Sequence, residues 1–195
     1  PLLAVVHQER PRSPGESDLK DETPIRSVSV VIPCLNAHST LATQLEALCR
    51  QTWEAELEVI VTDNGSSDGS QEIATEFQSR LPGLRLVDAS DHQSPGHARN
   101  AGAAKARGEA LLFCDAGDEV DEDWISAMVR GLSSSSMVAS RYDAEKLNSE
   151  AVRRIHPENP QQNGLGQYTY LPFLEHAGRS EEPTAELQSR SDLVC

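Results

Sequence analysis

The chain has 195 residues and a formal net charge of −14 at pH 7. This charge argues against a general nucleic-acid-binding protein, which presents a basic face, and an aromatic content of 4% leaves few rings for stacking on bases. Because no apolar segment approaches the ~20 residues needed to cross a bilayer, the sequence predicts no membrane span in this chain.

Short apolar segments alternate with amphipathic segments between residues 26 and 148. The elements predicted in chain order are a strand over 27–32, a helix capped by Ser39 or Thr40, a strand over 57–61, a helix over 70–80, a strand over 84–87, a helix over 97–107, a strand over 110–114, a helix over 121–132 and a short strand over 137–139. This alternation predicts an α/β fold of βαβ layers with a mainly parallel central sheet.

Prolines, glycines and acidic residues mark the boundaries of these elements. Pro33 is expected to end the first strand, Gly108 to cap the third helix at its C-terminus, and Asp121 to cap the start of the fourth helix. Residues 1–25 contain several prolines and many charges with little periodicity, so they are predicted to be a disordered lead-in.

Acidic and small polar residues follow two of the predicted strands. Asp63 and Asn64 come directly after the second strand, and Asp115 and Asp118 follow the fourth. Ligands of open parallel sheets bind at the carboxyl ends of the strands, so we expect these side chains to meet at one crevice. A crevice of this composition suits a metal ion and a phosphorylated ligand.

Asp115 and Asp118 are the candidate metal ligands. Magnesium in such sites takes one or two carboxylates, several waters and phosphate oxygens of the substrate. A turn in which Asp118 caps the following helix explains the same spacing, and the spacing alone does not decide between the two interpretations.

Asp63 and Arg99 are the candidate nucleotide contacts. A carboxylate just past a strand can accept a hydrogen bond from a nucleobase or a ribose hydroxyl. Arg99 lies in the first turn of an alanine-rich helix, where its side chain and the helix N-terminus both favour a diphosphate. A surface arginine is the alternative interpretation of Arg99.

The sequence disfavours a zinc site and two classes of nucleotide-binding protein. The cysteines (Cys34, Cys49, Cys114, Cys195) form no CxxC pair, so we interpret them as free thiols in a reducing compartment, not as zinc ligands. The first strand is not followed by GxGxxG, which disfavours a dinucleotide dehydrogenase. No GxxxxGK[ST] occurs, which excludes a P-loop NTPase.

In combination, these segments resemble family 2 glycosyltransferases. The resemblance covers residues 27–148 and rests on VSVVIPCLN at 28–36, EVIVTDNGSSDGS at 58–70, ARNAG at 98–102 and GEALLFCDAGD at 108–118. It implies a GT-A, Rossmann-like fold, a nucleotide-diphospho-sugar donor and a divalent metal, Mn²⁺ or Mg²⁺. It also implies inverting transfer, of the hexosyltransferase type, to an acceptor hydroxyl by a single displacement.

The resemblance also assigns residues. The implied donor-binding residues are Pro33, Asn36, Asp63, Asn64, Arg99 and Asp115. Pro33 and Asn36 lie in the first donor-binding loop, Asp63 contacts the nucleobase or ribose, and Arg99 lies near the nucleotide. Asp115 is the first acid of the family's Asp-x-Asp motif.

One position departs from the family pattern. The family commonly reads Asp-Ala-Asp-Asp, and this chain has Gly117 where the usual metal-binding acid stands. The implied metal ligands are therefore Asp115 and Asp118, with a weakly held metal as the other interpretation. No residue matches the family's catalytic base, so none is assigned here.

The leading hypothesis is the donor-binding half of a glycosyltransferase that acts on an unknown glycan, lipid or small-molecule acceptor. A nucleotide-sugar-binding module without turnover is the first alternative, because Gly117 breaks the motif and the base is missing. A nucleotidyltransferase would need a glycine-rich basic loop after the first strand, and residues 34–37 are not one. A receiver domain would need a lysine partner, and Lys105 is poorly placed for that role.

The expected organisation is a lead-in over 1–25, a nucleotide-sugar-binding domain over 26–148, an incomplete acceptor-side region over 149–178 and a non-native tail over 179–195. The tail closely matches a translated sequencing adapter, so the natural protein is expected to continue differently beyond residue 178. The expected location is the cytoplasm, with the inner membrane face as an option for the full-length protein.

Overall fold

The computed structural model describes residues 4–7, 24–133, 135 and 137–140. The strands are β1 (Ala4–His7), β2 (Ser27–Cys34), β3 (Glu56–Asp63), β4 (Leu84–Asp88), β5 (Ala110–Phe113) and β6 (Met137–Ala139), and the helices are α1 (Leu41–Cys49), α2 (Ser70–Phe77), α3 (Pro95–Lys105) and α4 (Trp124–Leu132). The regions expected over 149–178 and 179–195 lie outside the described residues.

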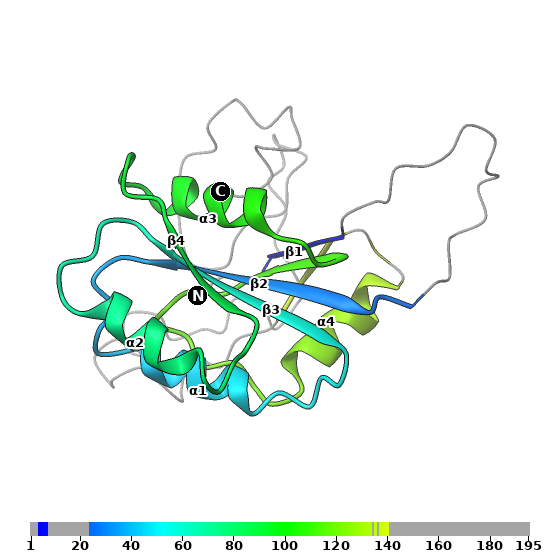
Figure 1. Cartoon of the computed structure of the whole chain (residues 1–195). Coiled ribbons are helices and arrows are strands. Elements are labelled where there is room, and N and C mark those ends of the chain that lie inside the picture. Colours follow the sequence, from blue (N-terminus) through cyan, green and yellow to red (C-terminus); the bar gives the residue numbers. More distant parts are fainter. Residues whose placement is uncertain (1–3, 8–23, 134, 136, 141–195) are drawn as a thin grey trace, which may run out of the picture.

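A six-stranded sheet runs through the described part of the chain in the order β4-β3-β2-β5-β1-β6 (Figure 1). Strands β2 to β5 are parallel, whereas β1 pairs antiparallel with both β5 and β6. The chain moves outward from β2 to β3 and β4 and then returns to place β5 on the other side of β2. This reversal at β2 is the point where open α/β sheets bind ligands.

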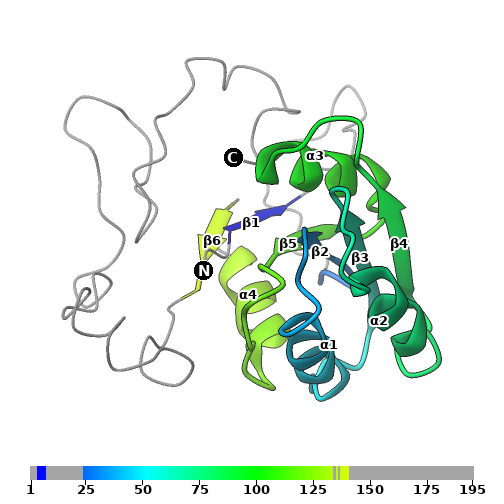
Figure 2. The same ribbon diagram turned by 90° about the vertical axis from the view of Figure 1, so that its left-hand side faces the viewer.

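Helices cover both faces of the sheet, with α1, α2 and α4 on one face and α3 on the other (Figure 2). The alternation of side chains along β2 explains this arrangement. Val28, Val30 and Ile32 point into the large core beneath α1, α2 and α4, whereas Val31 points to the opposite face, into a smaller cluster against α3. The predicted α/β fold with a parallel central sheet is therefore confirmed.

Pro33 does not end β2, contrary to expectation. The carbonyl of Cys34 accepts from Asn64 of the β3 side, and the carbonyl of Val31 accepts from Cys114 of the β5 side. The backbone groups of successive residues in a strand point to opposite neighbouring strands. Those of Pro33 therefore point to β5, whose pairing with β2 ends at Phe113. The missing N–H of Pro33 therefore removes no ladder hydrogen bond.

Strand β1 lies within the segment predicted to be a disordered lead-in, so that prediction is wrong for Ala4–His7. Val5 pairs with Leu112 on one side and Val138 on the other, which fills the place between β5 and β6. The sequence did not reveal this strand because it is short and its partners lie about a hundred residues away.

The helix caps predicted at Thr40, Asp121 and Gly108 are wrong. Thr40 precedes α1, but its side chain makes no cap bond: its hydroxyl donates to the carbonyl of Ala37, and the N–H of Thr43 donates to the Thr40 carbonyl. Asp121 accepts from the N–H of Asp123, before α4 begins. Helix α3 ends at Lys105, so Gly108 is not its cap.

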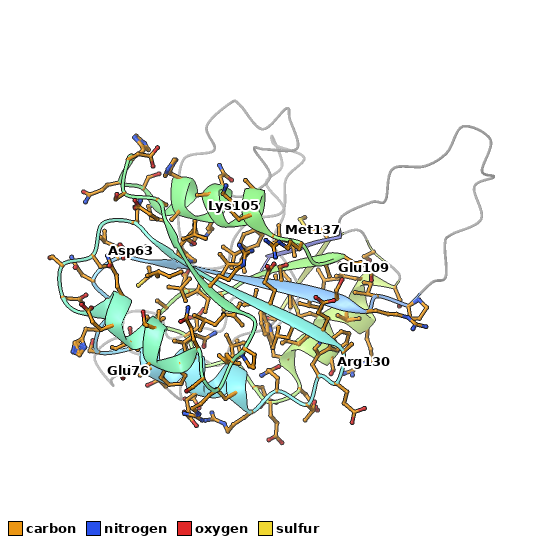
Figure 3. The ribbon with its side chains drawn as sticks, in the orientation of Figure 1. Asp63, Glu76, Lys105, Glu109, Arg130 and Met137 are labelled. Atoms are coloured by element: carbon orange, nitrogen blue, oxygen red, sulfur yellow. The ribbon has the colours of Figure 1, made fainter. Side chains whose placement is uncertain are left out.

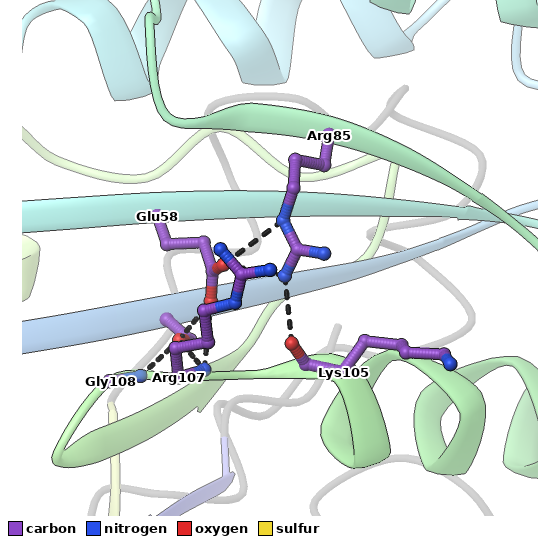
Figure 4. A network of polar contacts seen from close by, with 6 residues as sticks. Glu58, Arg85, Lys105, Arg107 and Gly108 are labelled. Atoms are coloured by element: carbon purple, nitrogen blue, oxygen red, sulfur yellow. Dashed lines mark hydrogen bonds and ion pairs between the residues drawn. The ribbon is translucent and has the colours of Figure 1, made fainter.

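A polar network attaches the end of α3 to the sheet (Figure 4). Glu58 accepts from Ser29 Oγ at 2.6 Å, from the Arg107 N–H at 3.0 Å and from Arg85 at 2.5 Å. Arg85 also donates to the carbonyl of Lys105 at 2.7 Å. Burial by itself would raise the pKa of Glu58, but these hydrogen bonds hold it below its ordinary value. The carboxylate therefore stays charged and keeps α3 in place.

Replacement of Gly108 by alanine is expected to destabilise the fold by about 2 kcal/mol. An added Cβ would lie 2.5 Å from the backbone nitrogen of Ser29, which cannot move without disturbing β2. Urea unfolding measures the change. Gly117→Ala is the matched control, because a Cβ at Gly117 meets nothing within 4 Å. Equal stability of the two variants would contradict the prediction.

Candidate functional site

The carboxyl ends of the parallel strands form the candidate site. Cys34, Asp63 and Asp88 lie side by side in the register of β2, β3 and β4. Asp115 follows β5 two residues after the pair of Val31 with Phe113. Asp63 and Asp115 therefore flank the end of β2, about 10 Å apart at two inter-strand spacings. Figure 3 shows Asp63 at this end of the sheet and Glu109 at the opposite end.

The loops after β2 and β3 form one unit at this edge. The hydrogen bonds between them join Asn36 N to Ser66 Oγ (3.0 Å), Ser67 N to Asn36 Oδ1 (2.9 Å), Ala37 N to Ser70 Oγ (2.9 Å) and His38 N to Asp68 Oδ2 (2.9 Å). Asn36 has a φ of 50°, a left-handed conformation in which asparagine is enriched. Of the two predicted residues here, Asn36 holds the loops together, and Pro33 lies half-buried in β2 beneath them.

Asp63 is nearly buried, with 4% of its surface exposed. Its two oxygens accept from the N–H of Ser66 at 3.2 and 3.3 Å, and one of them also accepts from Gln71 Nε2 at 2.7 Å. A carboxylate offers about four lone-pair positions, so one more donor can be accepted. Sequence reasoning missed Gln71; its place in the first turn of the helix after Asp63 was the available signal.

Asn64 is used within the protein. Its side-chain nitrogen donates to the carbonyl oxygens of Ala89 and, at 2.9 Å, His92. It thereby holds the loop after β4 against the end of β3. Asp88, which sequence reasoning also missed, accepts from Ser90, and hydrogen bonds from the Ser90 side chain and N–H lower its pKa. The signal for Asp88 was its position at a strand end, as for Asp63.

Arg99 and Asp115 meet across the end of β5. Arg99 Nη2 donates to Asp115 Oδ1 at 2.9 Å, and the exposed fractions of these side chains are 11% and 32%. The serine cap at Ser94, which accepts from the N–H of His97, starts α3 and directs Arg99 towards the acidic loop, defined here as residues 115–119. The structure thus places Arg99, predicted to lie near the diphosphate, against the strand-end acid Asp115.

Asp118 turns its carboxylate towards its own loop. Oδ2 accepts from the N–H of Asp115 at 3.0 Å, so a ligand role for Asp118 rests on its second oxygen. Burial raises the pKa of Asp118 from 3.8 to about 6, and the negative charge of Asp115 adds to this effect. The hydrogen bond from Asp115 N–H and the charge of Arg99 act in the opposite direction.

The side chains at this edge of the sheet include carboxylates that suit a divalent cation. Within the described residues, no three histidine, cysteine or acidic side chains gather in a way that could hold a metal ion. Asp115 is half-exposed, and the space around Gly117 is open. One or two carboxylates are enough for Mg²⁺-type sites in which waters and phosphates complete the shell, so Asp115 fits a metal of this kind.

Two buried thiols lie near the site. Cys34 and Cys114 are buried and free. Burial raises the pKa of each above its ordinary value, so both remain protonated near neutral pH.

Among the helices of the described residues, none is long and apolar enough to cross a membrane.

Comparisons with known proteins agree with this geometry. The sequence matches the family described as glycosyl transferase family 2 over residues 29–185. The putative glycosyltransferase EpsH of Bacillus subtilis is 33% identical over 148 residues, covering 73% of this chain and 42% of that protein. Glycosyltransferase AglE of Haloferax volcanii is 34% identical over 110 residues, covering 56% of this chain and 35% of that protein.

A solved structure shares the fold. TarS 1-349 of S. aureus in complex with UDP-GlcNAc superposes with a TM-score of 0.51 at 26% identity, over 54% of this chain and 31% of that one. The sheet, its helices and this likeness define an α/β protein of the GT-A fold. The family match over most of its length places the chain in glycosyl transferase family 2. The chain spans less than half the length of EpsH and of AglE.

Proposed function

We propose that this chain binds a nucleotide-diphospho-sugar and forms the donor half of an enzyme that transfers the sugar to an acceptor hydroxyl with inversion. The observation that carries the proposal is the Arg99–Asp115 ion pair on one side of the end of β2, with Asp63 on the other side. Asp115 and Asp63 are about 10 Å apart. This spacing suits a nucleoside on one side and a diphosphate on the other. TarS in complex with UDP-GlcNAc supports a uridine-type donor.

Each residue has a distinct proposed role. Asp63, held by Ser66 and Gln71, accepts from the nucleobase or ribose with its remaining lone pair. Arg99 neutralises the diphosphate as a charge-assisted donor. Asp115, with the second oxygen of Asp118, would hold a divalent cation, which supplies charge neutralisation to the leaving diphosphate when bound.

The remaining parts of the proposal concern the whole protein. A base that takes the proton of the acceptor hydroxyl completes the displacement, and the described residues supply no side chain that we assign to this step. The free thiols of Cys34, Cys49 and Cys114 support a reducing, cytoplasmic location. The acceptor is a glycan, lipid or small molecule with a free hydroxyl.

Calorimetric titration of the chain with UDP and GDP tests the proposal. We expect binding in the presence of Mn²⁺, and Asp115→Asn should weaken it about tenfold because the half-exposed carboxylate is lost. Asp121→Asn is the control, since Asp121 is an exposed acid of the same connection. Unchanged binding in EDTA would remove the metal from the proposal. Binding of neither nucleotide would refute the proposal as a whole.

Gly117 favours one second candidate, a module that binds the nucleotide sugar without turnover. The open space at Gly117 leaves the usual second carboxylate position without a side chain. Sugar transfer by a protein of the relatives' full length separates the candidates. Donor hydrolysis or transfer excludes the binding module, and tight binding without either reaction supports it.

A further inference from the structure

Gln44 is a fully buried polar side chain on α1 that the proposed roles do not explain. Its Nε2 donates to Cys114 Sγ at 2.9 Å, and its Oε1 accepts from the N–H of Val120 at 3.2 Å. Cys114 directly precedes the acidic loop and Val120 directly follows it. One side chain therefore holds both ends of the loop that carries Asp115 and Asp118.

We propose that Gln44 is a positioning residue that fixes the acidic loop for the diphosphate and its cation. This inference rests on the proposed function of the site. Burial of an amide is costly unless its donor and acceptor are both used, and an apolar side chain would suit the core at this position better. The two hydrogen bonds to the ends of one functional loop account for a polar residue there.

The other contacts of the loop fix it less completely than Gln44, and the hydrogen bond from the Cys114 N–H to the carbonyl of Val31 fixes its start alone. The bonds between Asp118 and Asp115 are internal, so they fix the shape of the loop and not its position. Arg50 pairs with Glu119 at 3.3 Å, but its side chain is 48% exposed, and exposed ion pairs constrain little. Arg99 reaches the loop from the opposite face of the sheet, through α3.

Gln44 also connects the two sides of the site. Helix α1 begins directly after the loop of Asn36, which is hydrogen-bonded to Ser66 and Ser67 after β3. The same helix, through Gln44, reaches the end of β5. The nucleoside side and the diphosphate side are thereby fixed relative to each other by one rigid element.

Gln51 provides a matched control. Its Oε1 accepts from the N–H of Ile125 at 3.0 Å, and its Nε2 donates to the carbonyl of Asp121 at 2.6 Å. It joins the end of α1 to the same connection, but beyond the acidic loop. Gln44→Met and Gln51→Met keep the length of the side chain. They remove two hydrogen bonds at Gln44 and three at Gln51, whose Nε2 also donates to the carbonyl of Ala47 at 3.2 Å.

The test is calorimetric titration of the full chain and both variants with UDP in the presence of Mn²⁺, at a temperature where circular dichroism shows each to be folded. We expect Gln44→Met to weaken binding about tenfold and Gln51→Met to leave it within about twofold. Equal weakening in both variants, or none in Gln44→Met, would overturn the proposal. If Gln44→Met does not fold, Cys114→Ala, which removes one of the two contacts, should weaken binding and decides the question in the same way.

Amide hydrogen exchange without ligand separates this proposal from the proposed function. We expect faster exchange over residues 115–120 in Gln44→Met than in Gln51→Met. If the unmodified chain binds no nucleotide, the proposed function fails, and faster exchange still shows that Gln44 fixes the loop. Identical exchange in the two variants would refute the positioning role whatever the nucleotide result.

Discussion

Asp118→Asn is expected to stabilise the metal-free protein by about 3 kcal/mol near neutral pH and to change its stability little near pH 4. Burial of the Asp118 carboxyl raises its pKa to about 6, against an ordinary value of 3.8. Asparagine keeps an oxygen that can accept from the N–H of Asp115, as Oδ2 of Asp118 does, and carries no charge.

The direction of the pH dependence follows from proton binding. Between about pH 4 and pH 6 the folded protein keeps the proton of Asp118 while the unfolded chain releases it, so this group makes folding less favourable as the pH rises. Above about pH 6 the cost is constant, because the carboxylate is charged in both states. The variant lacks this cost, so its advantage grows from about pH 4 to pH 6 and then stays level.

Urea unfolding at several pH values in EDTA measures the difference between the two proteins. Asp88→Asn is a control of opposite sign, because hydrogen bonds from Ser90 lower the pKa of the exposed Asp88 carboxylate. The charged Asp88 carboxylate contributes to folding stability above its ordinary pKa, and this contribution is lost as the pH falls. Asp88→Asn should therefore be destabilising at neutral pH. A pH-independent effect of Asp118→Asn would contradict the burial argument.

The sequence predicted the sheet because side-chain periodicity is a local property. The short, β-branched segment over 27–32 and the turn residues from Asp63 to Gly65 identify a strand and a turn without knowledge of any partner. The convergence of Asp63 and Asp115 then follows from the geometry of parallel strands, and the register confirms it. The fold, and the strand ends at which the candidate site lies, were therefore predictable.

The partners of the site residues were not predictable in the same way. The acidic loop is held by Gln44, more than seventy residues earlier in the chain. Such bonds depend on how helices pack over the sheet, and no local pattern records that packing. The same limit applies to Asn64: the hydrogen bonds from its side-chain nitrogen to the carbonyls of Ala89 and His92 could not be foreseen, and its contact with the donor stays a prediction.

The Gly117→Asp variant is expected to bind Mn²⁺ about a hundredfold more tightly than the natural chain in the presence of UDP. A second carboxylate close to Asp115 adds a full negative charge and a hard oxygen donor. The side chain can be accommodated, because a Cβ at Gly117 meets nothing within 4 Å and the backbone there is not in the left-handed region. The gain in affinity therefore carries little cost in folding.

Calorimetric titration of Mn²⁺ into the UDP-saturated protein measures this gain. Gly117→Asn is the matched control, since it adds an oxygen donor of the same size without the charge and should bring only a small part of the increase. Equal gains in the two variants would show that space, and not charge, limits the site. Unchanged affinity in Gly117→Asp would show that Asp118, through its second oxygen, already completes the site, and the glycine would then have no consequence for metal binding.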